Sequence, residues 1–110
     1  TPESWQETIA TECRDSNAFG CKILGDSMSP SFEEGDVLVL MPNEEIYTGL
    51  FGVAKFRDGG VLFRRFNVEG DVITAIPSNV RYPLKEYQRD EFEWIYPVYE
   101  ARRFLWKGKK

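Results

Sequence analysis

The hydrophobic positions of this chain fall in short runs of strand length, and residues typical of turns separate the runs. Val37–Met41 is apolar throughout, which predicts a strand that is buried on both faces. Phe19–Leu24 predicts an earlier strand. Phe92–Tyr99 predicts the last one, which continues through residues 101–106. Pro97 within it indicates an edge position or a β-bulge, because proline has no N–H to donate to a strand ladder.

Two hairpins are predicted in the middle of the chain. Residues 50–57 and 61–66 are both strand-like, and Asp58-Gly59 between them strongly favours a tight β-turn. The second hairpin turns within Asn67–Asp71 and returns through Val72–Ile76. Both hairpins add antiparallel pairs to the predicted sheet.

One short helix is expected ahead of the strands. Ser4 is suited to cap a helix over Ser4–Glu12, since Glu7 follows at capping-box spacing. Asp26–Pro30 has turn chemistry, and Tyr82–Leu84 is expected to be extended because a residue before proline avoids helical backbone angles. Many short strands with turns between them predict a mostly β domain, a sheet or barrel-like arrangement of short antiparallel strands and hairpins with little helix.

The length of 110 residues fits one domain. The pattern divides it into an N-terminal linker or short helix over residues 1–18, a β domain over residues 19–106 and a basic tail over residues 107–110. The formal net charge is -4, and an acidic domain is poorly suited to bind DNA phosphates by itself. Any contact with DNA is therefore expected from another segment.

Composition excludes or disfavours several kinds of chemistry. The chain has no histidine, which rules out Ser-His-Asp and Cys-His catalysis within it. Cys13 and Cys21 neither make a secreted disulfide framework nor fill a zinc shell, so we expect no metal and no cofactor. No apolar stretch is long enough to span a bilayer, and Thr1–Phe19 lacks the apolar run of a signal peptide. A cytoplasmic protein that does not bind membranes is expected.

The stretch around Ser27 carries the most specific motif. Gly25–Pro30, followed by Phe32–Val39, combines a Ser-Met pair after a strand with a Gly-Asp turn that leads into an apolar strand. This arrangement resembles the nucleophile segment shared by LexA-like repressors, phage repressors and signal peptidases.

Three later stretches extend the resemblance. Val61–Phe66 resembles the strand that carries the catalytic lysine in these families. Ile73–Pro83 resembles the next strand and its turn, in a form typical of the phage-repressor branch, and Trp94–Phe104 resembles the closing strand. The resemblance covers residues 19–106 and implies a LexA/signal-peptidase-like β fold.

The resemblance also implies roles for individual residues. Ser27 takes the nucleophile position, and the backbone N–H of Met28 would donate to an oxyanion. A serine hydroxyl needs a base, and in these families a lysine kept neutral by burial supplies it. Arg64 stands where that lysine is expected, and arginine stays protonated. We therefore expect a peptidase scaffold without its general base.

Lys55 is the alternative base. If Asp58-Gly59 alone forms the hairpin turn, Lys55 pairs with Leu62 and shares a face with Arg64. The simpler interpretation is a solvated lysine, because exposed lysine is the norm. Lys22, on the strand before the nucleophile position, is a weaker candidate.

The residues and the resemblance together imply a C-terminal dimerization and regulatory domain of a LexA-like or phage-type transcriptional repressor, without autoproteolysis because Arg64 replaces the lysine base. The family implies a homodimer formed through this domain, and DNA binding in an SOS-like response through an upstream helix-turn-helix domain outside this chain. The alternative is an active serine-lysine autopeptidase that cleaves its own linker with Ser27 as nucleophile.

Two further interpretations are disfavoured, self-cleavage within this chain and a relationship to the signal peptidases. The residues before Ser27 contain no Ala-Gly or Cys-Gly pair, the kind of bond that the self-cleaving families cut. A relative of the signal peptidases is disfavoured as well, because it would need a membrane anchor and a longer catalytic body.

Overall fold

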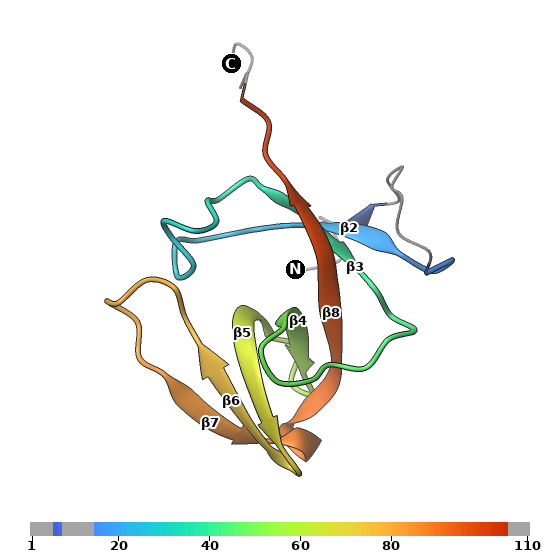
Figure 1. The fold of residues 1–110 in the computed structure, drawn as a ribbon, viewed down its shortest axis with the longest axis vertical. Helices are drawn as coiled ribbons and strands as arrows, with labels where there is room; N and C mark the ends of the chain where they lie inside the picture. The colour runs from blue at the N-terminus through green and yellow to red at the C-terminus, as the bar shows by residue number, and fades with distance from the viewer. Residues whose placement is uncertain (1–5, 8–14, 106–110) are drawn as a thin grey trace.

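Antiparallel strands make up almost all of the regular structure (Figure 1). The computed structural model describes residues 6–7 and 15–105. Its elements are β1 (Gln6–Glu7), β2 (Phe19–Lys22), β3 (Val37–Leu40), β4 (Phe51–Phe56), β5 (Val61–Glu69), β6 (Val72–Ile76), β7 (Lys85–Gln88), the 3₁₀ turn η2 (Arg89–Glu91) and β8 (Phe92–Arg102). They form an 8-stranded sheet in the order β1-β2-β3-β8-β4-β5-β6-β7, and neighbouring strands are antiparallel. The predicted mostly β fold with little helix is confirmed.

The long strand β8 connects the two halves of the sheet (Figure 1). Its first part, through Pro97, pairs with β4, and its second part, from Val98, pairs with β3. β8 is therefore an interior strand, so the edge position expected for Pro97 is wrong, whereas the β-bulge expected as its alternative agrees with the register shift beside it. The missing N–H is tolerated because the strand changes partner there, while the Pro97 carbonyl accepts the Met41 N–H at 3.0 Å. A register irregularity in the β3–β8 ladder follows at once, between Val39 and Leu40.

Apolar side chains fill two core clusters that lie on opposite faces of β4. Ala54 belongs to the cluster built around Phe66 and Ile73, whereas Val53 belongs to the cluster built around Leu38. Consecutive residues of one strand serve both clusters because their side chains point to opposite faces. Strand β3 is buried at each position, as its apolar run predicted.

The N-terminal segment departs from its prediction. Gln6–Glu7 forms β1, which pairs with Gly20 and Cys21 of β2, so the helix predicted over Ser4–Glu12 is wrong at these residues. The rest of that predicted helix lies outside the described residues, as does the basic tail at 107–110. Among the described residues, no helix is long and apolar enough to cross a membrane.

The hairpin between β4 and β5 has a longer turn than expected. Lys55 pairs with Val61, one residue away from the partner that the two-residue turn implied. The turn contains Gly59 at φ 105°, a left-handed backbone angle that glycine adopts without strain. A shift of one residue exchanges the faces, so Lys55 lies on the opposite face of the hairpin from Arg64. The expected shared face is wrong.

The second hairpin largely follows its prediction. β6 has the bounds expected from the sequence, whereas β5 continues past Phe66 to Glu69. The connecting turn narrows to Gly70-Asp71, with Gly70 at φ 61°. β7, which pairs with β6 at the far edge of the sheet, has no counterpart among the predicted strands.

Candidate functional site

The loop that carries Ser27 connects β2 to β3 and is held against the sheet. The β2–β3 ladder continues into it, since the Ile23 N–H donates to the Asp36 carbonyl at 2.9 Å. Further along the loop, the ring of Phe32 packs edge-on against Phe51 and Phe63, with centroid distances of 5.1 Å to both. These contacts fix the Ser27 loop on β4 and on β5, and β5 is the strand that carries Arg64.

A second loop, between β6 and β7, fixes the backbone around Ser27 from the other side. The Asn79 N–H donates to the Ser27 carbonyl at 3.0 Å, and the Asn79 side-chain amide donates to the Asp26 carbonyl at 3.0 Å. The Ser78 N–H points at the sulfur of Met28 at 3.3 Å, and that side chain is buried. The position of the Ser27 hydroxyl is therefore set by packing and by backbone hydrogen bonds.

Arg64 contacts the Ser27 hydroxyl directly. Its Nη1 donates to Ser27 Oγ at 2.6 Å and to the Phe63 carbonyl at 2.8 Å. Burial lowers the pKa of Arg64 from its ordinary value, but that value lies so far above neutrality that the guanidinium stays protonated. A protonated guanidinium donates hydrogen bonds and has no lone pair with which to take the serine proton. The geometry is that of a donor held on the hydroxyl.

Tyr82 and Asp26 complete this end of the site. The Tyr82 hydroxyl donates to Asp26 Oδ1 at 2.6 Å, and this hydrogen bond is the main cause of a raised pKa for Tyr82. The Arg64 guanidinium carbon lies 5.9 Å from the Tyr82 ring centroid, within the range of a cation–π contact. Among the described residues, no acidic side chain forms an ion pair with Arg64.

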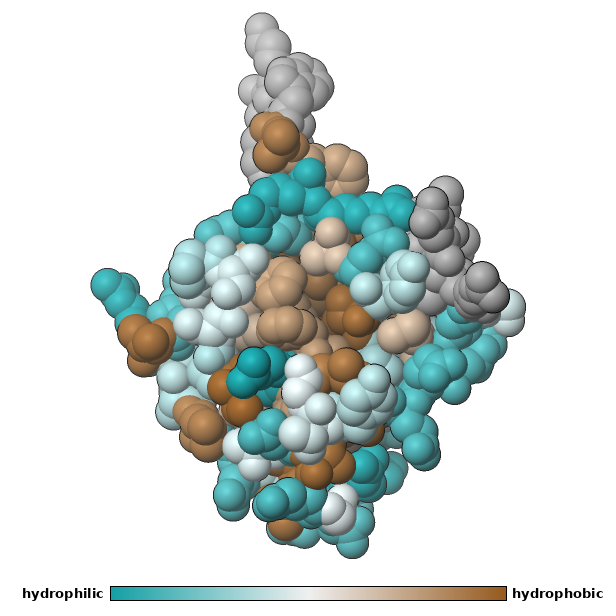
Figure 2. Space-filling view, in the orientation of Figure 1, coloured by the Kyte–Doolittle hydropathy of each residue, from teal (hydrophilic) through white to brown (hydrophobic). Residues whose placement is uncertain are grey.

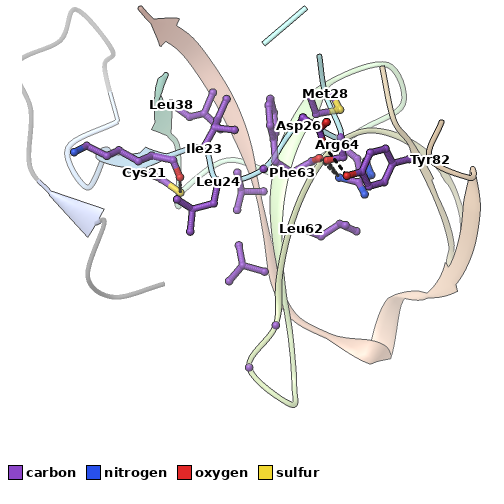
Figure 3. A pocket seen from close by; sticks show the side chains of 17 residues that line it. Cys21, Ile23, Leu24, Asp26, Met28, Leu38, Leu62, Phe63, Arg64 and Tyr82 are labelled. Carbon is purple, nitrogen blue, oxygen red and sulfur yellow. Dashed lines mark hydrogen bonds between the residues drawn. The ribbon is translucent and has the colours of Figure 1, made fainter. Parts of the chain in front are cut away.

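These residues line one end of a groove of about 710 Å³ between the β2 side and β5. Figure 3 shows Asp26, Arg64 and Tyr82 together at one end, while Cys21 and Leu38 lie at the other. Figure 2 shows apolar side chains in the centre of the face seen in Figure 1, with hydrophilic residues around them. The groove therefore combines an apolar length with a polar, cationic end.

The remaining expected site residues have distinct places. In the described part of the chain, no hydrogen bond uses the backbone N–H of Met28, so this group is available as a donor beside Ser27. Lys55 has its ammonium 3.8 Å from a Glu93 carboxylate, on the face away from Arg64. Burial raises the pKa of the Cys21 thiol to about 12, which keeps it protonated and unreactive at neutral pH.

Sequence reasoning missed some functional contacts. The resemblance marked residues 73–83 as a characteristic strand and turn, but assigned no role to Asn79 or Tyr82 within it. The only local signals were an Asn in a turn and a Tyr before Pro83. In the described residues, no cluster of three or more His, Cys, Asp or Glu side chains is arranged to hold a metal ion.

A family model matches most of the chain. This model, of the family described as Peptidase S24-like, matches residues 2–98. The match confirms the resemblance to this family that the sequence indicated, and the matched range contains Ser27 and Arg64. No curated protein matched the chain. The chain belongs to the Peptidase S24-like family.

Proposed function

We propose that this chain is the regulatory and dimerization domain of a LexA-like or phage-type transcriptional repressor, and that it does not cleave itself. One observation carries the proposal: the hydroxyl at the nucleophile position accepts a hydrogen bond from Arg64 Nη1 at 2.6 Å. The group that contacts Ser27 is a permanent cation, where the peptidase reaction needs a neutral amine. The scaffold keeps the serine, the loop that positions it and the Met28 N–H, but in the described part of the chain no lysine forms a hydrogen bond with Ser27.

Neither alternative lysine is placed to replace that acceptor. Lys55 lies on the other face of the β4–β5 hairpin and interacts with Glu93. Lys22 borders the groove with an exposed side chain, and no hydrogen bond joins it to Ser27 in the described part of the chain. An active autopeptidase therefore has no candidate base among these residues.

Exposed apolar side chains support association through this domain. Phe104 and Leu105, just after β8, are 59% and 88% exposed, and Tyr99 on β8 is 47% exposed. Exposed aromatic and other large apolar side chains are typical of the contacts in protein interfaces. We assign the homodimer contact to this region. Contact with DNA is assigned to an upstream helix-turn-helix domain, since the net charge of -4 makes this chain a poor partner for phosphates. We place the repressor in the cytoplasm.

The test is self-cleavage of the intact protein. Wild type, Ser27→Ala and Arg64→Lys are incubated between pH 7 and pH 10, a range that would neutralise a buried lysine, and fragments are sought by mass spectrometry. Wild type should stay whole at every pH. Specific fragments from wild type that are missing from Ser27→Ala would show that the serine has found a base, and the proposal would fail.

A further inference from the structure

Arg64 has donors that no acceptor of the described residues uses. A guanidinium carries five N–H groups in a planar fork. Both of its hydrogen bonds, to Ser27 Oγ and to the Phe63 carbonyl, leave from Nη1, so Nε and Nη2 have no acceptor in the described part of the chain. A half-buried cation with unused donors and no acidic partner is suited to bind an anion.

The surroundings of Arg64 add positive charge and little negative charge. Arg64 also borders a smaller pocket of about 180 Å³, together with Lys85 and Tyr82, and no acidic residue lines that pocket. The main groove has one acidic residue in its lining, Asp26, whose Oδ1 already accepts the Tyr82 hydroxyl. An anion at the Arg64 guanidinium would therefore be surrounded mainly by hydrogen-bond donors and cations, and the one nearby carboxylate already has a partner.

The rest of the groove is suited to an extended apolar chain. Its lining includes Leu24, which is exposed, and Val61 and Leu62, which are half-buried. Strand β5 pairs with β6 only from Arg65 onward. In the described residues, the edge of Val61–Arg64 on the β6 side therefore has no strand partner. An unpaired strand edge offers backbone donors and acceptors to an added peptide strand, and apolar walls accept its side chains.

We propose that the groove binds the C-terminal end of an apolar peptide, whose terminal carboxylate is held by the Arg64 fork beside the Ser27 hydroxyl. The Arg64 guanidinium matches a carboxylate with two parallel N–H donors, and the neighbouring Met28 N–H has no acceptor among the described residues. An uncut peptide bond at this place carries no charge for Arg64, so the residue selects free chain ends. The proposal rests on the non-cleaving function above, because a working serine-lysine pair would need this position for its base.

The test compares two peptides that differ only at their ends. N-acetylated Ala-Val-Leu-Val-Ala is prepared with a free carboxylate and as the C-terminal amide, and each is titrated into the isotopically labelled chain by NMR. The free acid should bind on the order of 10- to 100-fold more tightly, as expected for hydrogen bonds to a charged group. The Arg64 Nε–H signal should shift with the acid only. Arg64→Gln should lose the preference, and Arg64→Lys should retain part of it.

Arg65→Gln is the matched control, because it removes the same charge from the adjacent, exposed position of β5. It should keep the full preference for the acid. Equal affinity for acid and amide, no binding of either peptide to wild type, or an equal loss in both glutamine variants would each overturn the proposal. Mass spectra of the same samples test the function separately: hydrolysis of the amide peptide or of the chain contradicts the absence of cleavage, whichever peptide binds better.

Discussion

Two arginines reach the same β2–β3 loop from different strands, and they meet different partners. Arg103, directly after β8, binds the Asp36 carboxylate, with Nε at 3.0 Å from Oδ1 and Nη2 at 2.9 Å from Oδ2. The Asp36 side chain is only 3% exposed. Arg64, from β5, meets the uncharged hydroxyl of Ser27 instead. The first contact joins two opposite charges and closes the fold, whereas the second leaves a cation available in a groove.

This difference predicts that the Asp36–Arg103 contact contributes to stability, whereas the Ser27–Arg64 contact contributes to ligand recognition. A buried carboxylate is stable only while its charge is balanced and its oxygens accept hydrogen bonds. Asp36 meets both needs, since it also accepts the Glu33 N–H at 3.0 Å. Arg64 has no such partner in the described residues, so its replacement breaks no ion pair.

Asp36→Ala should lower the stability of the fold more than Arg64→Gln does. It removes the acceptor of the Glu33 N–H and the partner of Arg103, which should lower the free energy of unfolding by about 2 kcal/mol. Urea unfolding at neutral pH measures this change. Asp71→Ala is the control, because Asp71 is exposed and its loss changes the net charge equally. If Asp36→Ala lowers the free energy of unfolding no more than Asp71→Ala does, the Asp36–Arg103 contact does not stabilise the fold.

Arg64→Gln should have a smaller effect on the same measurement. The variant loses the hydrogen bonds to Ser27 and Phe63, but it also removes the desolvation of a half-buried cation. The two changes oppose each other, so the free energy of unfolding should stay within about 1 kcal/mol of wild type. A loss as large as that of Asp36→Ala would mean that Arg64 is a structural residue, and the two arginines would no longer differ in kind.

The predictability of the strands follows how fully each one is buried. The apolar run of β3 and the turn residues that precede β6 identified both strands from the local sequence alone. β7 has the sequence KEYQ, of which only Tyr87 is partly buried, so its composition does not distinguish it from a loop. It becomes a strand because β6 offers a partner edge, and this tertiary influence commonly overrides β propensity.

The register of the β4–β5 hairpin could not be predicted from the sequence. Asp58-Gly59-Gly60 has two consecutive glycines, and a two-residue turn or a longer one both fit such a sequence. The choice decides the face on which Lys55 lies. A turn with one more residue placed it away from Arg64, which no local pattern could reveal.

At the site, the resemblance to a family achieved what local pattern could not. It associated Ser27 with Arg64, and the structure brings these residues together across 37 positions of sequence. The contact of Asp36 with Arg103 spans 67 positions and had no such guide, since Asp36 was understood only as a turn former. Long-range side-chain contacts depend on the completed sheet, which is why the roles of Tyr82 and Asn79 also emerged only from the structure.

We propose that Ser27 occupies a nucleophile position without being activated, and its chemical reactivity tests this directly. A fluorophosphonate reagent, which modifies activated serines, is added to wild type, Arg64→Lys and Ser27→Ala across pH 7 to 10, and the modified residue is located by peptide mass mapping. Wild type should show no labelling above the Ser27→Ala background. Labelling of Arg64→Lys should rise with pH as the introduced lysine loses its proton. Labelling of wild type at Ser27 as fast as in Arg64→Lys would show that Ser27 is activated despite Arg64.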